Sequence, residues 1–285
     1  MSHAARKTEA THLTITPLTP TIGAEIGGID LRTLPDAATL SALRDALLEW
    51  KVLFFREQDI TTDEHVAFAR AFGELEVHPF APHKPGYPEV LAITHGPGNR
   101  GRENTWHSDV TWRLEPSLGS ILRAVEIPEV GGDTLFADMY AAYEGLKDEV
   151  KAEIEGRNAV HDFNHFRKGM RKRGMSEAEI EEFNRKYPEV EHPIVRTHPE
   201  TGRKGLYVNA AFTMRIVGME KERSDSLLRH LYAQASIPEY QCRFRWRKNS
   251  LAFWDNRSTQ HYAASDYYPA VRAMERVTIV GDRPR

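Results

Sequence analysis

Short apolar runs of strand-like composition recur along this 285-residue chain, and they do not alternate regularly with helices. Regular strand–helix alternation is what a doubly wound parallel sheet requires, so its absence argues against that architecture. The pattern favours an all-β core with flanking helices, an α+β protein built as a double-sheet β roll. The runs expected to form strands are 51–55, 119–125, 134–137, 205–209, 251–254 and 276–280.

The flanking helices are predicted from apolar spacing and from residues that favour helix ends. Ser176 and Glu179 have the spacing of a capping box and predict the start of a mostly polar helix. The other expected helices are one around Leu40–Leu48, 62–72, a single helix over 140–154, and 221–235. No internal repeat or Gly/Ser-rich linker divides the chain, so we expect one domain over residues 1–285, with residues 1–10 as a short flexible tail.

Composition excludes several classes of function. The formal net charge is −3, which argues against bulk electrostatic binding of nucleic acid or anionic membrane. No apolar segment approaches the roughly 18 residues needed to span a bilayer. Cys242 is the only cysteine, so no intramolecular disulfide and no multi-thiolate zinc site can form, and a reducing cytoplasmic location is expected. The chain also lacks GxGxxG and Walker motifs, which weakens nucleotide-binding hypotheses.

The sequence Trp-His-Ser-Asp over 106–109 is the first candidate for chemistry. If it is extended, His107 and Asp109 lie on one face about 6.6 Å apart, where an imidazole and a carboxylate can bind one side of a metal ion. A histidine from elsewhere would complete a facial triad, and His161, His192, His198 and His261 are all eligible by residue type. The simpler alternative is a hydrogen-bonded His/Asp pair in a strand.

Two arginines near the C-terminus are the next candidates. In an extended segment Arg272 and Arg276 share a face about 13 Å apart, and each guanidinium could hold a different anion. The alternative is that both are exposed or paired with acids such as Glu275. The basic run 167–173 is expected to be a solvated loop, and it has too few interleaved aromatic residues to predict nucleic-acid binding.

Taken together, these motifs resemble those of the Fe(II)- and 2-oxoglutarate-dependent dioxygenases of the taurine dioxygenase family. The likeness extends over nearly the whole chain, and its ordered spacing selects His261 among the histidines. The resemblance is carried by Leu13-Thr-Ile-Thr-Pro17, Ile22-Gly-Ala-Glu-Ile-Gly-Gly28, Phe72-Gly-Glu-Leu75, Trp106-His-Ser-Asp109, Gly131-Gly-Asp-Thr134, Val195-Arg-Thr-His-Pro199, Trp254-Asp-Asn-Arg257, Gln260-His-Tyr262, Asp266-Tyr267, Arg272, Arg276 and Gly281-Asp282.

The resemblance implies a double-stranded β-helix (a cupin-like jelly roll) and a specific set of site residues. His107, Asp109 and His261 would bind Fe(II), with no catalytic residue beyond the metal centre. Thr134 and Arg272 would hold the distal carboxylate of 2-oxoglutarate, and O2 would be the second co-substrate. The substrate sulfonate would lie against Arg276, in a pocket lined by His78, Val110 and Phe212.

The implied reaction hydroxylates a small anionic substrate, foremost a sulfonate such as taurine, and releases sulfite, an aldehyde, succinate and CO2. The family also implies a homo-oligomer, a dimer or tetramer, and a lid near 167–173. Two departures bear on the substrate: Ala81 and Glu103 stand where taurine-specific enzymes have a tyrosine and an asparagine. The alternatives are an alkyl sulfate, an aryloxy-carboxylate or an amino-acid-like intermediate, or a non-catalytic β-roll binding protein.

Overall fold

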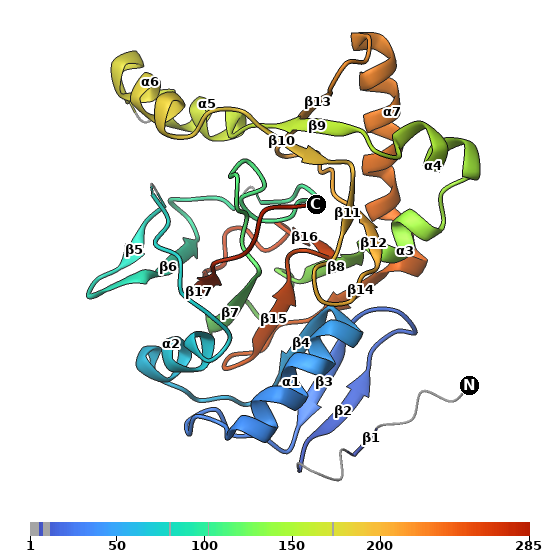
Figure 1. Cartoon of the computed structure of the whole chain (residues 1–285). Coiled ribbons are helices and arrows are strands. Elements are labelled where there is room, and N and C mark those ends of the chain that lie inside the picture. Colours follow the sequence, from blue (N-terminus) through green and yellow to red (C-terminus); the bar gives the residue numbers. More distant parts are fainter. Residues whose placement is uncertain (1–5, 8–11, 80, 102, 173) are drawn as a thin grey trace.

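The computed structural model of the protein describes residues 6–7, 12–79, 81–101, 103–172 and 174–285 (Figure 1). Its main feature is a large, mostly antiparallel sheet in which only β3 and β4 pair in parallel. In spatial order its strands are β1 (Arg6–Lys7), β2 (Thr14–Pro17), β3 (Ala24–Gly27), β4 (Val52–Phe55), β15 (Leu251–Asp255), β7 (Gly119–Glu126), β17 (Arg272–Ile279), β6 (Tyr87–His95) and β5 (His83–Lys84).

A smaller sheet faces the large one, and two further sets of short strands, called ribbons here, pair separately. The facing sheet has the order β14 (Gln241–Phe244), β8 (Thr134–Asp138) and β16 (Thr259–Ala263). The ribbons are β10 (Val190–Pro193) with β9 (Asn158–His161) and β13 (Thr213–Ile216), and β11 (Val195–Thr197) with β12 (Lys204–Leu206). The double-sheet prediction is therefore confirmed.

Apolar side chains that point alternately to the two faces of a strand explain why the sheets face each other. In β4, Val52 and Phe54 pack into the core between the sheets, while Leu53 and Phe55 pack into the core beneath the helices. Because successive side chains of a strand point to opposite faces, a fully apolar strand of this kind must be covered on both sides. Phe136 of β8 meets Trp254 of β15 across the inter-sheet core, with ring centroids 5.7 Å apart.

Helices cover the outer face of the large sheet and the ends of the roll (Figure 1). α1 and α2 contribute Leu43, Leu47 and Phe68 to the core on that outer face. The helices are α1 (Ala37–Trp50), α2 (Thr62–Arg70), α3 (Met139–Glu144), α4 (Asp148–Ile154), α5 (Asn164–Lys172), α6 (Glu177–Lys186) and α7 (Lys221–Ala233), with short 3-10 turns at Gln234–Ser236 and Pro238–Tyr240.

Three local predictions were wrong. The single helix over 140–154 is two helices, because Gly145 ends α3 and the hydroxyl of Tyr240 fills the space beside it, only 1.9 Å from where a Cβ would lie. The basic run is not a loop: it forms the end of α5, where Arg167 pairs with Asp162. Its last residue, 173, lies outside the described residues. The expected strand over 205–209 stops at Leu206.

The predicted capping box at Ser176 and Glu179 is present at the start of α6. Most of the expected tail lies outside the described residues, but Arg6–Lys7 pair with β2 instead of standing free. None of the helices formed by the described residues has the length and apolar character that crossing a lipid bilayer requires. The single-domain organisation stays a prediction.

Candidate metal centre and its surroundings

His107 and His261 are brought together by their backbones. An isolated antiparallel bridge joins them: the His107 amide donates to the His261 carbonyl at 3.1 Å, and the His261 amide donates back at 2.8 Å. His261 lies on β16 of the smaller sheet, whereas His107 lies in the segment after β6. The imidazole centroids are 4.2 Å apart. Residues 154 positions apart in the sequence (261 minus 107) are thus held side by side.

Asp109 reaches the same point from a turn rather than from the extended strand that the sequence suggested. Asn256 fixes this turn with two hydrogen bonds: the Asp109 amide donates to its side-chain oxygen at 2.7 Å, and its amide nitrogen donates to the Asp109 carbonyl at 2.9 Å. Burial opposes ionisation of Asp109, but Arg276, His261 and His107 lower its pKa to about 2. The carboxylate is therefore ionised at neutral pH.

These three side chains fit a divalent metal ion. Their ligand atoms lie within 4.8 Å of one another, and Asp109 Oδ1 is 3.9 Å from His107 Nε2 and 4.0 Å from His261 Nε2. His107 Nδ1 donates to the Thr105 carbonyl at 2.7 Å, so in the neutral tautomer of this ring Nε2 carries the lone pair that a metal needs. Burial, with His107 next, lowers the pKa of His261 to about 3, so its ring is neutral. Neutral imidazoles and an ionised carboxylate are the protonation states that metal binding requires.

The other eligible histidines have partners elsewhere. His161 hydrogen-bonds Thr111 at 3.0 Å, His192 donates to the Arg113 carbonyl at 2.8 Å, and His198 donates to Asp255 at 3.0 Å. All three are buried. Each therefore stabilises the fold, and the geometry brings only His261 of the four to the His107–Asp109 pair within the described part of the chain.

Arg272, itself buried, lines a cavity beside the candidate metal centre. Thr134, His107, His261 and Arg276 line the same cavity. The Arg272 Nε donates to the Gly132 carbonyl at 3.1 Å, but among the described residues its Nη2 has no hydrogen-bond partner although the residue is only 4% exposed. Such a cation fits an incoming carboxylate, because an unpaired buried charge is costly.

Thr134 can contribute to the same carboxylate site. Its Oγ1 accepts from Trp246 Nε1 at 2.9 Å, so its hydroxyl proton can be donated elsewhere. The approach of Arg272 depends on Gly132, whose φ is +72° and where a Cβ would lie 3.1 Å from Arg272 Cδ. Asp266 holds this turn by accepting from the Gly132 amide at 2.8 Å.

The expected substrate residues also lie around the candidate metal centre. Arg276 Nη1 donates to Asp109 Oδ1 at 2.8 Å. Val110 and Phe212 belong to one buried apolar cluster, and the Phe212 ring is 6.2 Å from that of His107. Burial first, then Arg276 and Arg113, lowers the pKa of His78 to about 3. Since His78 Nδ1 accepts from the Ala81 amide at 3.1 Å, the neutral ring carries its proton on Nε2.

The two departures from the taurine pattern are visible in the structure. The Glu103 side chain is 51% exposed and pairs with His95 at 3.5 Å while lining the cavity of Arg272. Tyr267 hydrogen-bonds the other nitrogen of His95 at 3.0 Å. Ala81 adds no polar group to the loop that carries His78.

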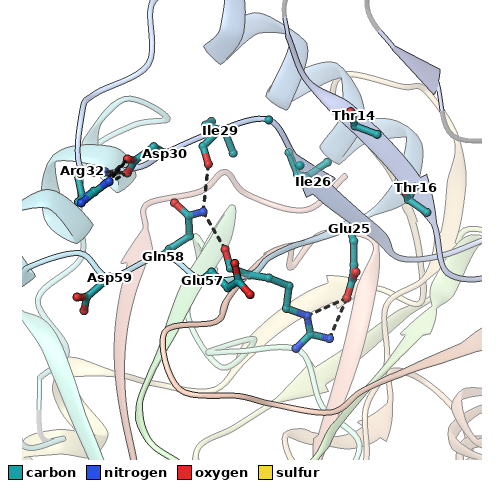
Figure 2. A pocket seen from close by; sticks show the side chains of 13 residues that line it. Thr14, Thr16, Glu25, Ile26, Ile29, Asp30, Arg32, Glu57, Gln58 and Asp59 are labelled. Carbon is teal, nitrogen blue, oxygen red and sulfur yellow. Dashed lines mark hydrogen bonds and ion pairs between the residues drawn. The ribbon is translucent and has the colours of Figure 1, made fainter.

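A second, larger hollow lies at the outer end of β2 and β3 (Figure 2). It contains none of the predicted site residues. Two ion pairs lie within it: Glu25 pairs with Arg56, and Asp30 pairs with Arg32. The Gln58 side chain donates to the Ile29 carbonyl at 3.1 Å, as Figure 2 shows. We therefore interpret it as a structural surface hollow.

Sequence reasoning gave no role to Asn256 or Asp266, although both lie in motifs quoted for the resemblance. Asn256 clamps the backbone of Asp109, and Asp266 clamps the turn beside Arg272. The signal for them was available: a buried polar residue next to a metal-binding or anion-binding candidate needs hydrogen-bond partners. A β roll with two histidines and one carboxylate converging between its sheets defines the class of mononuclear non-haem Fe(II) oxygenases.

Comparison with known proteins specifies the family. A family model described as Taurine catabolism dioxygenase TauD, TfdA family matches residues 14–278. An alkylsulfatase of Acinetobacter baylyi is 39% identical over 276 residues, covering 95% of this chain and 86% of the relative. An alpha-ketoglutarate-dependent sulfate ester dioxygenase of Pseudomonas putida is 37% identical over 291 residues, covering 100% and 95%. The crystal structure of a taurine dioxygenase from Burkholderia xenovorans superposes with a TM-score of 0.82 at 40% identity, covering 95% of this chain and 90% of that one.

The chain therefore belongs to the TauD/TfdA family of dioxygenases. It is an Fe(II)- and 2-oxoglutarate-dependent dioxygenase with a cupin-like jelly-roll fold, which uses O2 as its second co-substrate. The alternative of a non-catalytic β-roll binding protein is thereby set aside.

Proposed function

We propose that this dioxygenase acts on small organic sulfate esters or sulfonates whose organic part is apolar. His107, Asp109 and His261 would hold Fe(II), while Arg272 and Thr134 would hold the distal carboxylate of 2-oxoglutarate. When bound, the ferrous ion supplies the redox step by which O2 oxidises 2-oxoglutarate to succinate and CO2 and hydroxylates the primary substrate. The carbon that bears the sulfo group is the expected target.

One observation carries the proposal: Arg276 lies 2.8 Å from the metal-site carboxylate Asp109. An anion held by this guanidinium would place the adjoining carbon next to the metal centre. Arginine suits sulfate and sulfonate oxygens because it donates two parallel hydrogen bonds. His78, neutral and protonated on Nε2, can add a donor without adding charge.

The apolar wall that starts at Val110, directly after Asp109, favours an apolar substrate body over the ammonium of taurine. Phe212 stacks on Phe166 at 5.8 Å, and Val110 and Trp112 continue the same apolar cluster. An aliphatic chain against this wall leaves water, which stabilises binding by about 25 cal/mol per Å². Taurine is the alternative, but its ammonium would need Glu103, which here pairs with His95.

The protein's own part in the reaction is positioning and exclusion of water. The guanidinium of Arg276 orients the anionic end, the apolar wall orients the organic end, and the buried Arg272 orients the co-substrate. A sulfate ester hydroxylated at its first carbon collapses to an aldehyde and sulfate, and a sulfonate collapses to an aldehyde and sulfite. Each product set balances with one O2, one succinate and one CO2.

A substrate panel tests the proposal. Fe(II)-loaded enzyme with 2-oxoglutarate would be given butyl sulfate, hexyl sulfate, hexanesulfonate or taurine, and succinate, sulfate, sulfite and aldehyde would be measured. We expect substrate-dependent succinate with butyl and hexyl compounds and markedly less with taurine. Taurine as the best substrate would contradict the apolar-wall argument, and no sulfo-anion turnover would contradict the proposal itself.

We also expect a cytoplasmic homo-oligomer. The expected location rests on Cys242, the single cysteine of the sequence, which can form no intramolecular disulfide. Light scattering on the purified chain would report a mass of two or four times 32.5 kDa if the oligomer forms.

A further inference from the structure

One carboxylate oxygen is shared between the metal centre and the anion site. Asp109 Oδ1 accepts from Arg276 Nη1 at 2.8 Å, and the same Oδ1 faces both histidines at 3.9 and 4.0 Å. Side-chain exposure at the pair is only 7% for Asp109 and 14% for Arg276. Water therefore screens their attraction poorly.

Arg276 pairs with Asp109 through one nitrogen of its guanidinium. Its neighbour on β17, Glu275, points to the opposite face of the sheet, where it pairs with Lys84 and Arg123. The nearby Glu76 pairs with Arg113 at 3.0 Å. Among the described residues, Asp109 is the acid that pairs with Arg276. Asp109 accepts from Nη1, while Arg276 Nε is buried with no hydrogen-bond partner among the described residues, so an external anion would share the guanidinium with this carboxylate.

Metal binding changes that competition. A divalent ion bound to Asp109 would neutralise the carboxylate that otherwise neutralises the Arg276 guanidinium. The positive charge of Arg276 would then attract an incoming anion. Without metal, the Asp109 charge both occupies Arg276 and repels the anion.

We propose that Arg276 is a metal-gated anion site, which binds the substrate's sulfo group tightly only after a divalent metal has taken Asp109. The inference rests on the proposed function, because it assumes that Arg276 holds the anionic end of the substrate. It adds an order of assembly: metal first, then anion. Because binding linkage is reciprocal, the anion must raise the affinity for the metal by the same factor as the metal raises the affinity for the anion. Typical coupling energies predict a factor of about ten or more.

The test is equilibrium binding without turnover. Calorimetry would measure butyl sulfate binding in chloride buffer to metal-free and to Mn(II)-loaded wild type, both without 2-oxoglutarate. The loaded protein should bind at least about tenfold more tightly, and butyl sulfate should tighten Mn(II) binding by the same factor. Equal affinities in the two states would overturn the gate.

An Asp109→Asn variant separates the gate from simple attraction between metal and anion. Without metal, this variant frees Arg276, so it should bind butyl sulfate more tightly than metal-free wild type. Equal or weaker binding by a variant with wild-type circular dichroism would overturn the gate, and the wild-type comparison still decides if the variant does not fold. Arg276→Met should lose binding in every state. If it binds like wild type, the proposed anion site itself is wrong.

Discussion

Replacing Arg272 tests the assignment of the co-substrate site. Arg272→Met removes a guanidinium that is 4% exposed and whose Nη2 has no partner among the described residues. If this group makes two charge-assisted hydrogen bonds to 2-oxoglutarate, each worth about 1.5 kcal/mol net, the loss is about 3 kcal/mol, or roughly 150-fold in affinity. The Kd of 2-oxoglutarate for Mn(II)-loaded protein, measured by calorimetry, should rise accordingly.

The same variant should cost the ligand-free protein little stability. It loses the hydrogen bond to the Gly132 carbonyl, worth about 1 kcal/mol, but it also removes an unpaired buried cation. The urea midpoint should therefore stay close to that of wild type. Arg243→Met, which alters an exposed arginine paired with Asp133, is the matched control and should leave the 2-oxoglutarate Kd unchanged.

Two results would refute this reasoning. An Arg272→Met variant that binds 2-oxoglutarate as wild type does would show that the unpaired guanidinium serves another purpose. An equal loss of 2-oxoglutarate affinity in Arg276→Met would show that Arg272 does not bind 2-oxoglutarate separately from the anion held by Arg276.

Three further predictions concern the supports of the site and the fold. Asn256→Ala, which removes the clamp on the Asp109 backbone, should weaken metal binding by about 10- to 100-fold in a Mn(II) titration; unchanged affinity would refute the clamp. Burial lowers the pKa of His65 and of His192 to about 4, so between pH 6.5 and 4 the unfolded chain binds more protons than the folded protein. The unfolding free energy measured by urea melts should therefore fall as pH drops through that window. An unfolding free energy that does not change with pH there would contradict this prediction. Glu275→Gln leaves Lys84 and Arg123 without their carboxylate and should cost about 3 kcal/mol of unfolding free energy, whereas Glu89→Gln at a more exposed pair should cost less than about 1 kcal/mol.

Local signals in the sequence predicted the elements that local physics determines. The capping box at Ser176 and the apolar run of β4 both formed as expected, because each depends on contacts within a few residues or on simple alternation. The break between α3 and α4 was missed because the apolar residues Tyr143, Leu146 and Val150 keep helical spacing across it. The basic run is helical, and two of its arginines, Arg167 and Arg171, pair with Asp162 and Glu177, which lie outside the run.

The sequence predicted which types of residue form the site, but not how the fold brings them together. His107 and Asp109 stood out by spacing, yet the residues alone left four histidines eligible, and resemblance was needed to select His261. The backbone bridge that joins His107 to His261 is a pairing between distant segments that no local pattern encodes. Val110 sits at a φ of +48°, unusual for a β-branched residue, directly after the Asp109 turn that Asn256 holds. The Arg276–Asp109 contact depends on that turn.

Metal stoichiometry tests the central claim most directly. After anaerobic reconstitution with Fe(II) and removal of free metal, wild-type protein should retain one iron per chain. His107→Ala and His261→Ala should each retain almost none, while His230→Ala, at an exposed position on α7, should retain one. Retention of a full iron equivalent by correctly folded His261→Ala would contradict the claim that these side chains form one metal centre.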